Sequence, residues 1–166
     1  MDVASKWLRS KPRGWVIADF GCGEAQLAQE LGAHATVHSF DLVSRNARVT
    51  ACNMAAVPLA YASCDAAVFS LALMGVDYPS FLAEALRVLK PKGWLWIAEV
   101  RSRFVPEGAD AEDFQPFIAA LAALGFALQK QDTANRMFVV WQLRKAGDGA
   151  AEAGWPVLKP CLYKRR

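Results

Sequence analysis

A short apolar run that leads directly into two glycines places the strongest constraint on how this chain folds. Residues 15–20 read Trp-Val-Ile-Ala-Asp-Phe, which predicts a buried strand, and Gly21-Cys22-Gly23 follows at once. Because glycine adopts backbone angles that other residues avoid and has no side chain, this turn is tight and leaves its backbone open to a ligand. Residues 24–31 have apolar positions at helical spacing, which predicts a helix whose first N–H groups bind an anionic group.

The rest of the chain alternates strand and helix patterns. Such alternation predicts a parallel sheet with helices on both faces. The turn sequence at residues 132–135 lies between two strand patterns and predicts an antiparallel C-terminal hairpin. We therefore expect an α/β, Rossmann-like fold with a mostly parallel seven-stranded sheet. The expected strands are residues 15–20, 35–40, 49–52, 65–71, 94–100, 126–131 and 137–143, the main helices are residues 24–31, 78–89 and 113–124, and residues 90–93 are expected to form a sharp turn.

Charge is distributed unevenly along the 166 residues, which are enough for a single domain over residues 1–166. The basic N-terminal segment, residues 1–14, carries a net charge of +3 and residues 155–166 carry +4, so the remainder carries −4 because the whole chain carries +3. We expect residues 146–166 to be a flexible linker and a basic C-terminal tail. Basic ends suit a polyanion such as nucleic acid, although solvated tails would look the same.

Several classes of protein are disfavoured by the sequence. No apolar run approaches the roughly 20 residues of a membrane span, so no membrane partner is expected. No apolar stretch follows the basic N-terminus, so we do not read a signal peptide there. The four cysteines form no metal-binding pattern, and a reduced intracellular compartment is the simplest interpretation. His34 and His38 are separated by a predicted strand, so no metal site is expected.

An acidic residue at the end of the second predicted strand points to a nucleoside ligand. Asp41 comes eighteen residues after Gly23 and can accept hydrogen bonds from both hydroxyls of a ribose. The dinucleotide-binding fingerprint requires a third glycine where Gln26 stands. That departure, together with Asp19 inside the first strand, favours S-adenosylmethionine over NAD as the cofactor.

Three further residues are candidates for contact with this cofactor. The amide of Asn53 can bond the adenine edge and Met54 can pack on the ring, but equally Asn53 caps a turn and Met54 belongs to the core. Ser70 ends the fourth strand, where the reactive end of the cofactor would lie, or it is an ordinary strand serine.

The segment that follows the fifth strand suggests contacts with a nucleic-acid substrate. Arg101 and Arg103 leave that strand at the ligand edge of the sheet, where they either hold phosphates or are simply solvated. Phe104 either stacks on a target base or, in the interpretation we prefer, is a core residue.

A series of short motifs runs through almost the whole chain. In chain order they are Ala18-Asp19-Phe20-Gly21-Cys22-Gly23, Phe40-Asp41-Leu42, Asn53-Met54-Ala55, Val57-Pro58-Leu59, Leu71-Ala72-Leu73-Met74-Gly75, Arg87-Val88-Leu89-Lys90-Pro91, Ala98-Glu99-Val100, Ser102-Arg103-Phe104 and Lys159-Pro160-Cys161-Leu162-Tyr163-Lys164-Arg165-Arg166. On these residues the sequence resembles the ribosomal RNA-processing protein 8 family, also represented by nucleomethylin. The resemblance implies a class I methyltransferase of the nucleus and nucleolus that methylates N1 of an adenine in large-subunit ribosomal RNA. It implies cofactor contacts at Gly21, Asp41, Asn53, Met54 and Ser70.

The resemblance leaves alternative functions open, and this chain departs from the family's sequence pattern in two places. Some members of the family join a chromatin-silencing complex, so a histone-binding module that keeps the fold is the alternative function. A small-molecule methyltransferase is a third, weakly opposed by the basic ends. The family has Asp where this chain has Asn53, so we expect weaker cofactor binding. The family also has a Tyr-His-x-Gly-Phe motif before the first strand, and we expect this chain to be a truncated domain that lacks it.

No catalytic residue is assigned from the sequence. Transfer of a methyl group from a sulfonium requires mainly positioning of the two reactants. N1 of adenine is already a nucleophile, so no general base is expected.

Overall fold

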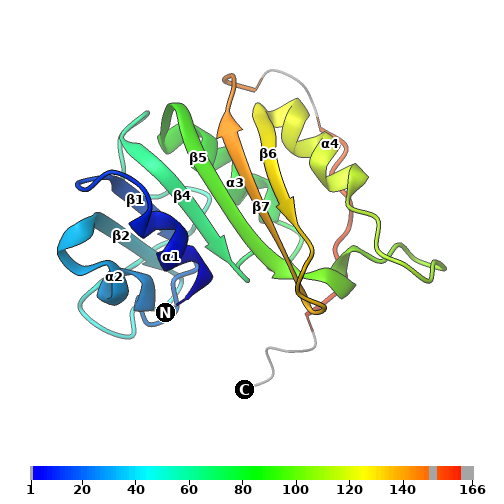
Figure 1. Ribbon diagram of the computed structural model, residues 1–166, viewed down its shortest axis with the longest axis horizontal. Helices are drawn as coiled ribbons and strands as arrows, with labels where there is room; N and C mark the ends of the chain where they lie inside the picture. The colour runs from blue at the N-terminus through cyan, green and yellow to red at the C-terminus, as the bar shows by residue number, and fades with distance from the viewer. Residues whose placement is uncertain (1, 150–152, 162–166) are drawn as a thin grey trace.

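The computed structural model describes residues 2–149 and 153–161 of the chain (Figure 1). Seven strands form one sheet in the order β3-β2-β1-β4-β5-β7-β6, in which β5, β7 and β6 are antiparallel neighbours and the other pairs are parallel. The structure thus confirms the mostly parallel sheet with an antiparallel hairpin. The strands are β1 (Val16–Phe20), β2 (Thr36–Asp41), β3 (Val49–Ala51), β4 (Cys64–Ser70), β5 (Leu89–Val100), β6 (Phe126–Asp132) and β7 (Phe138–Lys145).

Helices cover both faces of this sheet, as expected. Two pack on one face, α1 (Val3–Arg9) and α2 (Gln26–Leu31), and two on the other, α3 (Tyr78–Val88) and α4 (Gln115–Leu124). Two short 3-10 helices were not predicted, η1 (Gly32–His34) and η2 (Arg101–Phe104). In the described residues, no helix is long and apolar enough to cross a bilayer.

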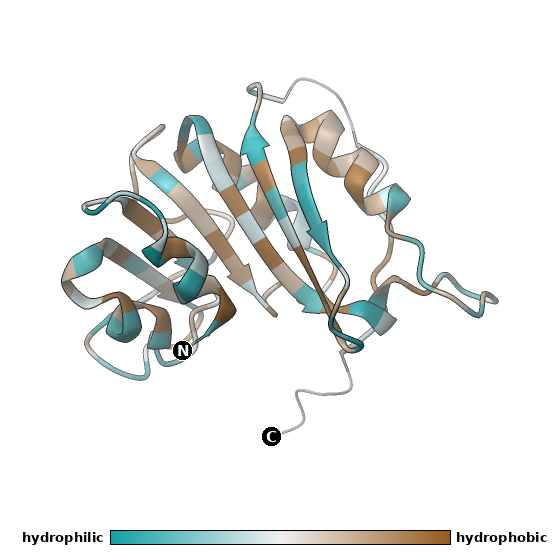
Figure 2. Ribbon diagram, in the orientation of Figure 1, coloured by the Kyte–Doolittle hydropathy of each residue, from teal (hydrophilic) through white to brown (hydrophobic). Residues whose placement is uncertain are grey.

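The central strands separate two apolar cores because their side chains alternate between the two faces. In β1, Ile17 joins the core beneath α1 and α2, whereas Ala18 and Phe20 join the larger core beneath α3 and α4. Figure 2 shows hydrophobic residues along the central strands and mainly hydrophilic residues along β6 at the edge. The carboxyl ends of the parallel strands therefore emerge from a fully packed sheet.

The sharp turn expected at residues 90–93 is instead an irregularity within β5. Lys92 has a φ of 63°, and the register with β4 shifts between Cys64 and Ala66. A Cβ on Gly93 would lie 2.8 Å from the carbonyl oxygen of Lys90. The strand therefore continues through the Lys-Pro-Lys-Gly segment by bulging, which a local sequence pattern does not distinguish from a turn.

Part of the segment expected to be a linker and tail packs against the face that carries α3 and α4. Trp155 and Leu158 contact that core, and the ring of Trp155 stands edge-on to Tyr78 at 5.8 Å. The backbone N–H of Lys159 donates to the carbonyl of Arg103 at 3.0 Å. The remaining residues of that expected segment, 150–152 and 162–166, lie outside the described part of the chain.

A buried ion pair joins this C-terminal segment to the sheet. Nη1 of Arg103 lies 3.0 Å from Oε2 of Glu99, and the side chains are 3% and 0% exposed. The same guanidinium donates to the carbonyls of Leu73 at 2.7 Å and Lys159 at 2.8 Å. Neither phosphate contact nor rim solvation describes Arg103, because its guanidinium is buried and engaged with Glu99 and two backbone carbonyls.

The other two candidates of this segment are also engaged internally. Arg101 pairs with Glu112 and donates to the carbonyls of Thr133 and Asn135, at 3.0 and 2.9 Å. Phe104 is 4% exposed and packs edge-on against Trp141 at 5.1 Å. Phe104 is therefore a core residue, and the partly exposed Arg101 is held by contacts within the protein.

We predict that Arg103→Met lowers the free energy of unfolding by about 3–5 kcal/mol, because it leaves the Glu99 carboxylate buried without its partner. Arg101→Met is the matched control, since its pair with Glu112 is partly exposed and worth about 1 kcal/mol or less. Urea unfolding of both variants measures the difference. Equal losses in the two variants would contradict the assigned role of the buried pair.

Candidate functional site

The glycine turn closes the carboxyl end of β1 against two neighbouring strands. The N–H groups of Gly21 and Cys22 donate to the carbonyl of Phe40, at 2.8 and 3.0 Å. Gly21 has a φ of 71°, and a Cβ there would lie 2.6 Å from Cβ of Ala72. Gly23 has a φ of 58°, but a Cβ there would meet nothing within 4 Å. Gly21 therefore permits internal packing, and Gly23 presents its backbone to open space.

Asp41 lies beside this turn, as its spacing from Gly23 predicts. It is the last residue of β2, and its Oδ2 accepts a hydrogen bond from the Gly23 N–H at 2.8 Å. Its Oδ1 accepts from the N–H of Leu42 at 2.7 Å. An ionised carboxylate accepts about four hydrogen bonds, so the half-buried side chain retains acceptor capacity for two hydroxyls.

Asn53 and Met54 follow β3. Their geometry fits parts of both interpretations, contact with the cofactor and a structural role in a turn and the core. Oδ1 of Asn53 accepts from the N–H of Ala55 at 2.9 Å, so the side chain does close a turn. Met54 is 8% exposed and belongs to the core, yet its Sδ lies 3.6 Å from the position of a Cβ on Gly21. The thioether of Met54 therefore borders the glycine turn, and the exposed amide of Asn53 precedes it in the chain.

Ser70 lies farther from the turn than the other candidates. It ends β4 opposite Ala98 and lines a cavity of about 470 Å³ on the sheet face that carries α1. Leu71 and Trp96 line the same cavity. Ala72, two residues later, provides the contact to Gly21. Gly21, Gly23, Asp41 and Met54 are thus brought together directly, whereas Ser70 borders a neighbouring space.

Asp19 is a buried acid that the sequence marked but did not place in the site. It is 5% exposed, and among the described residues no cation forms an ion pair with it. Burial raises the pKa of this carboxyl to about 7, with smaller contributions from the charges of Asp2 and Asp41. A site that holds unpaired carboxylates so close together favours a cationic ligand.

Burial and the neighbouring carboxylates also affect the pKa of the Cys22 thiol, which lies within the turn. Burial, followed by the charges of Asp19 and Asp41, raises the pKa of this thiol to about 12. The thiol therefore stays protonated at neutral pH and does not act as a nucleophile. In the described residues, no cluster of His, Cys, Asp or Glu could hold a metal ion.

Two exposed apolar side chains beside Asp41 were missed from the sequence. Leu42 and Val43 are 70% and 62% exposed. Two apolar residues directly after a strand-ending acid were the available signal, because solvated loops rarely need them. They offer an apolar surface next to the carboxylate, which suits the ring of a nucleoside.

The sheet order and the position of the glycine turn are those of S-adenosylmethionine-dependent methyltransferases. A methyltransferase of this kind from Methanosarcina mazei has a TM-score of 0.70, with 18% identity over 88% of this chain and 99% of that one. The Burkholderia thailandensis 1,6-didemethyltoxoflavin-N1-methyltransferase, with bound 1,6-didemethyltoxoflavin and S-adenosylhomocysteine, has a TM-score of 0.64, with 21% identity over 87% of this chain and 79% of that one. The fold is therefore that of a class I methyltransferase.

The whole chain, residues 1–166, matches the model of a family described as hypothetical methyltransferase, and it belongs to this family. Its relatives include ribosomal RNA-processing protein 8 of Arabidopsis thaliana, 46% identical over 96% of this chain and 56% of that protein, and of Mus musculus, 45% identical over 100% and 35%. The 25S rRNA (adenine(645)-N(1))-methyltransferase of Schizosaccharomyces pombe is 43% identical over 94% and 48%. The chain thus spans a third to just over half of these relatives.

We predict that Asp19→Asn stabilises the unliganded protein at pH 8 by up to about 4 kcal/mol. Because the folded-state pKa is about 7 and the unfolded value is near 3.8, the folded protein holds a proton that the unfolded chain releases between these values. The stability of the parent therefore falls as pH rises from 4 to 7, and the advantage of Asn appears over that range. Urea unfolding from pH 4 to 8 measures it, with the exposed Asp110→Asn as control.

A constant difference between Asp19→Asn and the parent at every pH would contradict this prediction. A control variant that reproduced the same pH dependence would do so as well, since Asp110 lies on an exposed loop.

Proposed function

We propose that this chain binds S-adenosylmethionine at the glycine turn and transfers its methyl group to N1 of an adenine in large-subunit ribosomal RNA. The observation that carries the proposal is the hydrogen bond between the Gly23 N–H and the Asp41 carboxylate, which places bare backbone and a ribose-binding acid side by side. The name of the Schizosaccharomyces pombe relative supports the target atom and the type of RNA. Membership of a methyltransferase family supports the reaction class.

The residues around the turn match the parts of this cofactor. The free acceptor sites of Asp41 suit the ribose hydroxyls, and the exposed Leu42 offers an apolar surface to the adenine. The exposed amide of Asn53 can bond the adenine edge. Asp19 has no ion-pair partner in the described residues, so a bound ammonium or sulfonium group would favour its ionised form and be stabilised by that charge.

The chain itself positions the reactants and needs no proton transfer before the reaction. When bound, the cofactor supplies an activated methyl group. Asp41 and Asp19 would hold the ribose and the cationic groups, so that N1 of the adenine could attack in line while the electron pair of the C–S bond stayed on sulfur. The target adenine must leave its stack to reach that methyl group. The protonated Cys22 thiol fits this account, because a displacement of this kind uses no protein nucleophile.

The cellular setting follows from the same proposal. With ribosomal RNA as its substrate, the protein would act in the nucleus and, within it, the nucleolus; the names of the relatives support the substrate. Those names refer to ribosomal RNA, so they give no support to the histone-binding alternative or to chromatin-silencing partners.

We predict that Asp41→Ala weakens S-adenosylmethionine binding at least tenfold, because two hydrogen bonds to the ribose are lost and the turn loses its acceptor. Isothermal titration calorimetry with the full chain measures the affinity. Asp110→Ala, an exposed loop acid, is the matched control and should bind like the parent. Equal affinities for Asp41→Ala and the control would exclude the proposed ribose contact.

A second prediction concerns the product in cells. Loss of this protein should remove N1-methyladenosine from large-subunit ribosomal RNA, as mass spectrometry of the digested nucleosides would show. Reintroducing the parent or Asp110→Ala should restore the modified nucleoside, and Asp41→Ala should not. Persistence of the modification in cells that lack the protein would refute the assignment of the target.

A further inference from the structure

A tryptophan on β5 is contacted by two cations. The ring centroid of Trp94 lies 4.5 Å from Nζ of Lys11 and 4.0 Å from Cζ of Arg144. Trp7 of α1 stands edge-on to Trp94 at 5.5 Å, and Lys11 lies 4.7 Å from its ring as well. All four side chains are partly exposed. Together with Lys92, whose carbonyl accepts from Arg144 at 2.7 Å, they form what we call the Trp94 surface.

Among residues 2–149 and 153–161, no carboxylate balances the positive charge of the Trp94 surface. In the described residues, Lys11, Lys92 and Arg144 form no ion pair. By contrast, the neighbouring Lys90 lies 3.0 Å from Asp65. Burial, followed by the charge of Arg144, lowers the pKa of Lys11, so the two cations repel each other around one ring. An anionic ligand would relieve this repulsion.

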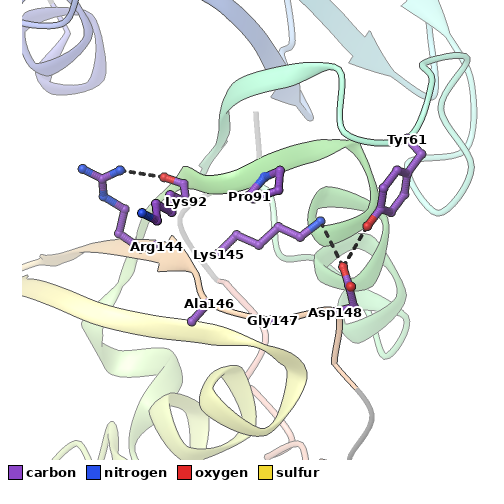
Figure 3. Close-up of a pocket in the computed structure, with 8 residues that line it drawn as sticks. All are labelled: Tyr61, Pro91, Lys92, Arg144, Lys145, Ala146, Gly147 and Asp148. Carbon is purple, nitrogen blue, oxygen red and sulfur yellow. Dashed lines mark hydrogen bonds and ion pairs between the residues drawn. The ribbon is translucent and has the colours of Figure 1, made fainter.

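A hollow continues from this surface at the end of the sheet where β5 begins and β7 ends. Its lining runs from Lys92 and Arg144 at one end to Tyr61, Lys145 and Asp148 at the other, with a volume of about 590 Å³ (Figure 3). At the far end the charges are matched, because Lys145 lies 3.6 Å from Asp148, which also accepts from the hydroxyl of Tyr61 at 2.8 Å. The uncompensated charge is therefore confined to the end that borders Trp94.

The Trp94 surface lies away from the candidate cofactor site but on the same sheet. Trp94 pairs with Ala66 of β4, and Ala98 pairs with Ser70 at the carboxyl end of that strand. Four residues of strand span roughly 13 Å, so the surface lies about that far from Ser70 along the strand direction. A ligand that reached from one to the other would need to be a chain rather than a small molecule.

We propose that the Trp94 surface binds the phosphate backbone of single-stranded RNA, with an unpaired base against the guanidinium plane of Arg144. This inference rests on the proposed function, because it assigns a docking surface to the same substrate. Arginine and lysine bind phosphate oxygens, and the guanidinium plane of an arginine also stacks on an unpaired base. The cations suit the phosphates and the partly exposed guanidinium of Arg144, held flat by Trp94, suits a base, whereas an acidic peptide would engage only the charges.

The test measures binding of the full chain to a fluorescein-labelled, unstructured 20-nucleotide RNA by anisotropy over a range of salt concentrations. The variant Lys92→Gln/Arg144→Gln should bind about tenfold more weakly and reduce the slope of log affinity against log salt by about two. Lys130→Gln removes an exposed lysine on β6 and is the control. Its affinity should stay within about twofold of the parent, and its salt slope should be nearly unchanged. Arg144→Lys keeps the charge but removes the guanidinium plane, so it should keep the salt slope of the parent and bind more weakly.

Calorimetry with S-adenosylmethionine separates this inference from the proposed function, because the Trp94 surface variants should bind the cofactor like the parent. RNA affinity within twofold of the parent for Lys92→Gln/Arg144→Gln would overturn the inference, whether or not the cofactor binds. Equal affinity of the parent for polyglutamate and for the RNA would overturn the assignment to nucleic acid. Failure of the parent to bind the cofactor would count against the proposed function alone.

Discussion

The contact between Gly21 and Ala72 is the constraint on which the candidate site depends. A Cβ on Gly21 would approach Cβ of Ala72 to 2.6 Å, so only glycine lets the ends of β1 and β4 come this close. The same residue holds a left-handed φ of 71°, and its N–H reaches across to the carbonyl of Phe40 on β2. One residue thus ties three adjacent strands together where the ligand edge begins, and the positions of Gly23 and Asp41 follow from it.

The acidic edge of the sheet is built at a cost in stability. Asp19 is buried beneath the turn with a pKa of about 7, so its ionised form is disfavoured in the unliganded protein. A residue chosen for stability alone would be apolar or amide at this position. A cationic ligand would offset the cost, because it supplies the charge that the protein leaves out. At Asp19, an uncharged side chain would favour stability, whereas a carboxylate would favour binding of a cation. Such a conflict is typical of functional sites.

The parts of this structure that the sequence predicted are those decided by local pattern and topology. The glycine turn, the mostly parallel sheet with its antiparallel hairpin and the proximity of Asp41 all follow from residues near one another in sequence or at corresponding strand ends. Arg103 was misplaced because its burial depends on Glu99 and on backbone that returns from residue 159, contacts that no local pattern reveals. The bulge at Lys92 was read as a turn for a similar reason, since pairing with β4 decides between them.

Opposite charges are separated on the sheet between the candidate cofactor site and the Trp94 surface. Carboxylates gather at the carboxyl ends of β1 and β2, where a sulfonium nucleoside would bind, and uncompensated cations gather around Trp94. An RNA chain drawn only by charge would avoid the acidic edge, because Asp19 and Asp41 repel its phosphates. Anchoring the backbone on the Trp94 surface resolves this conflict: the phosphates stay with the cations, and a single unstacked base, which carries no charge, is the part of the substrate that approaches the carboxylates.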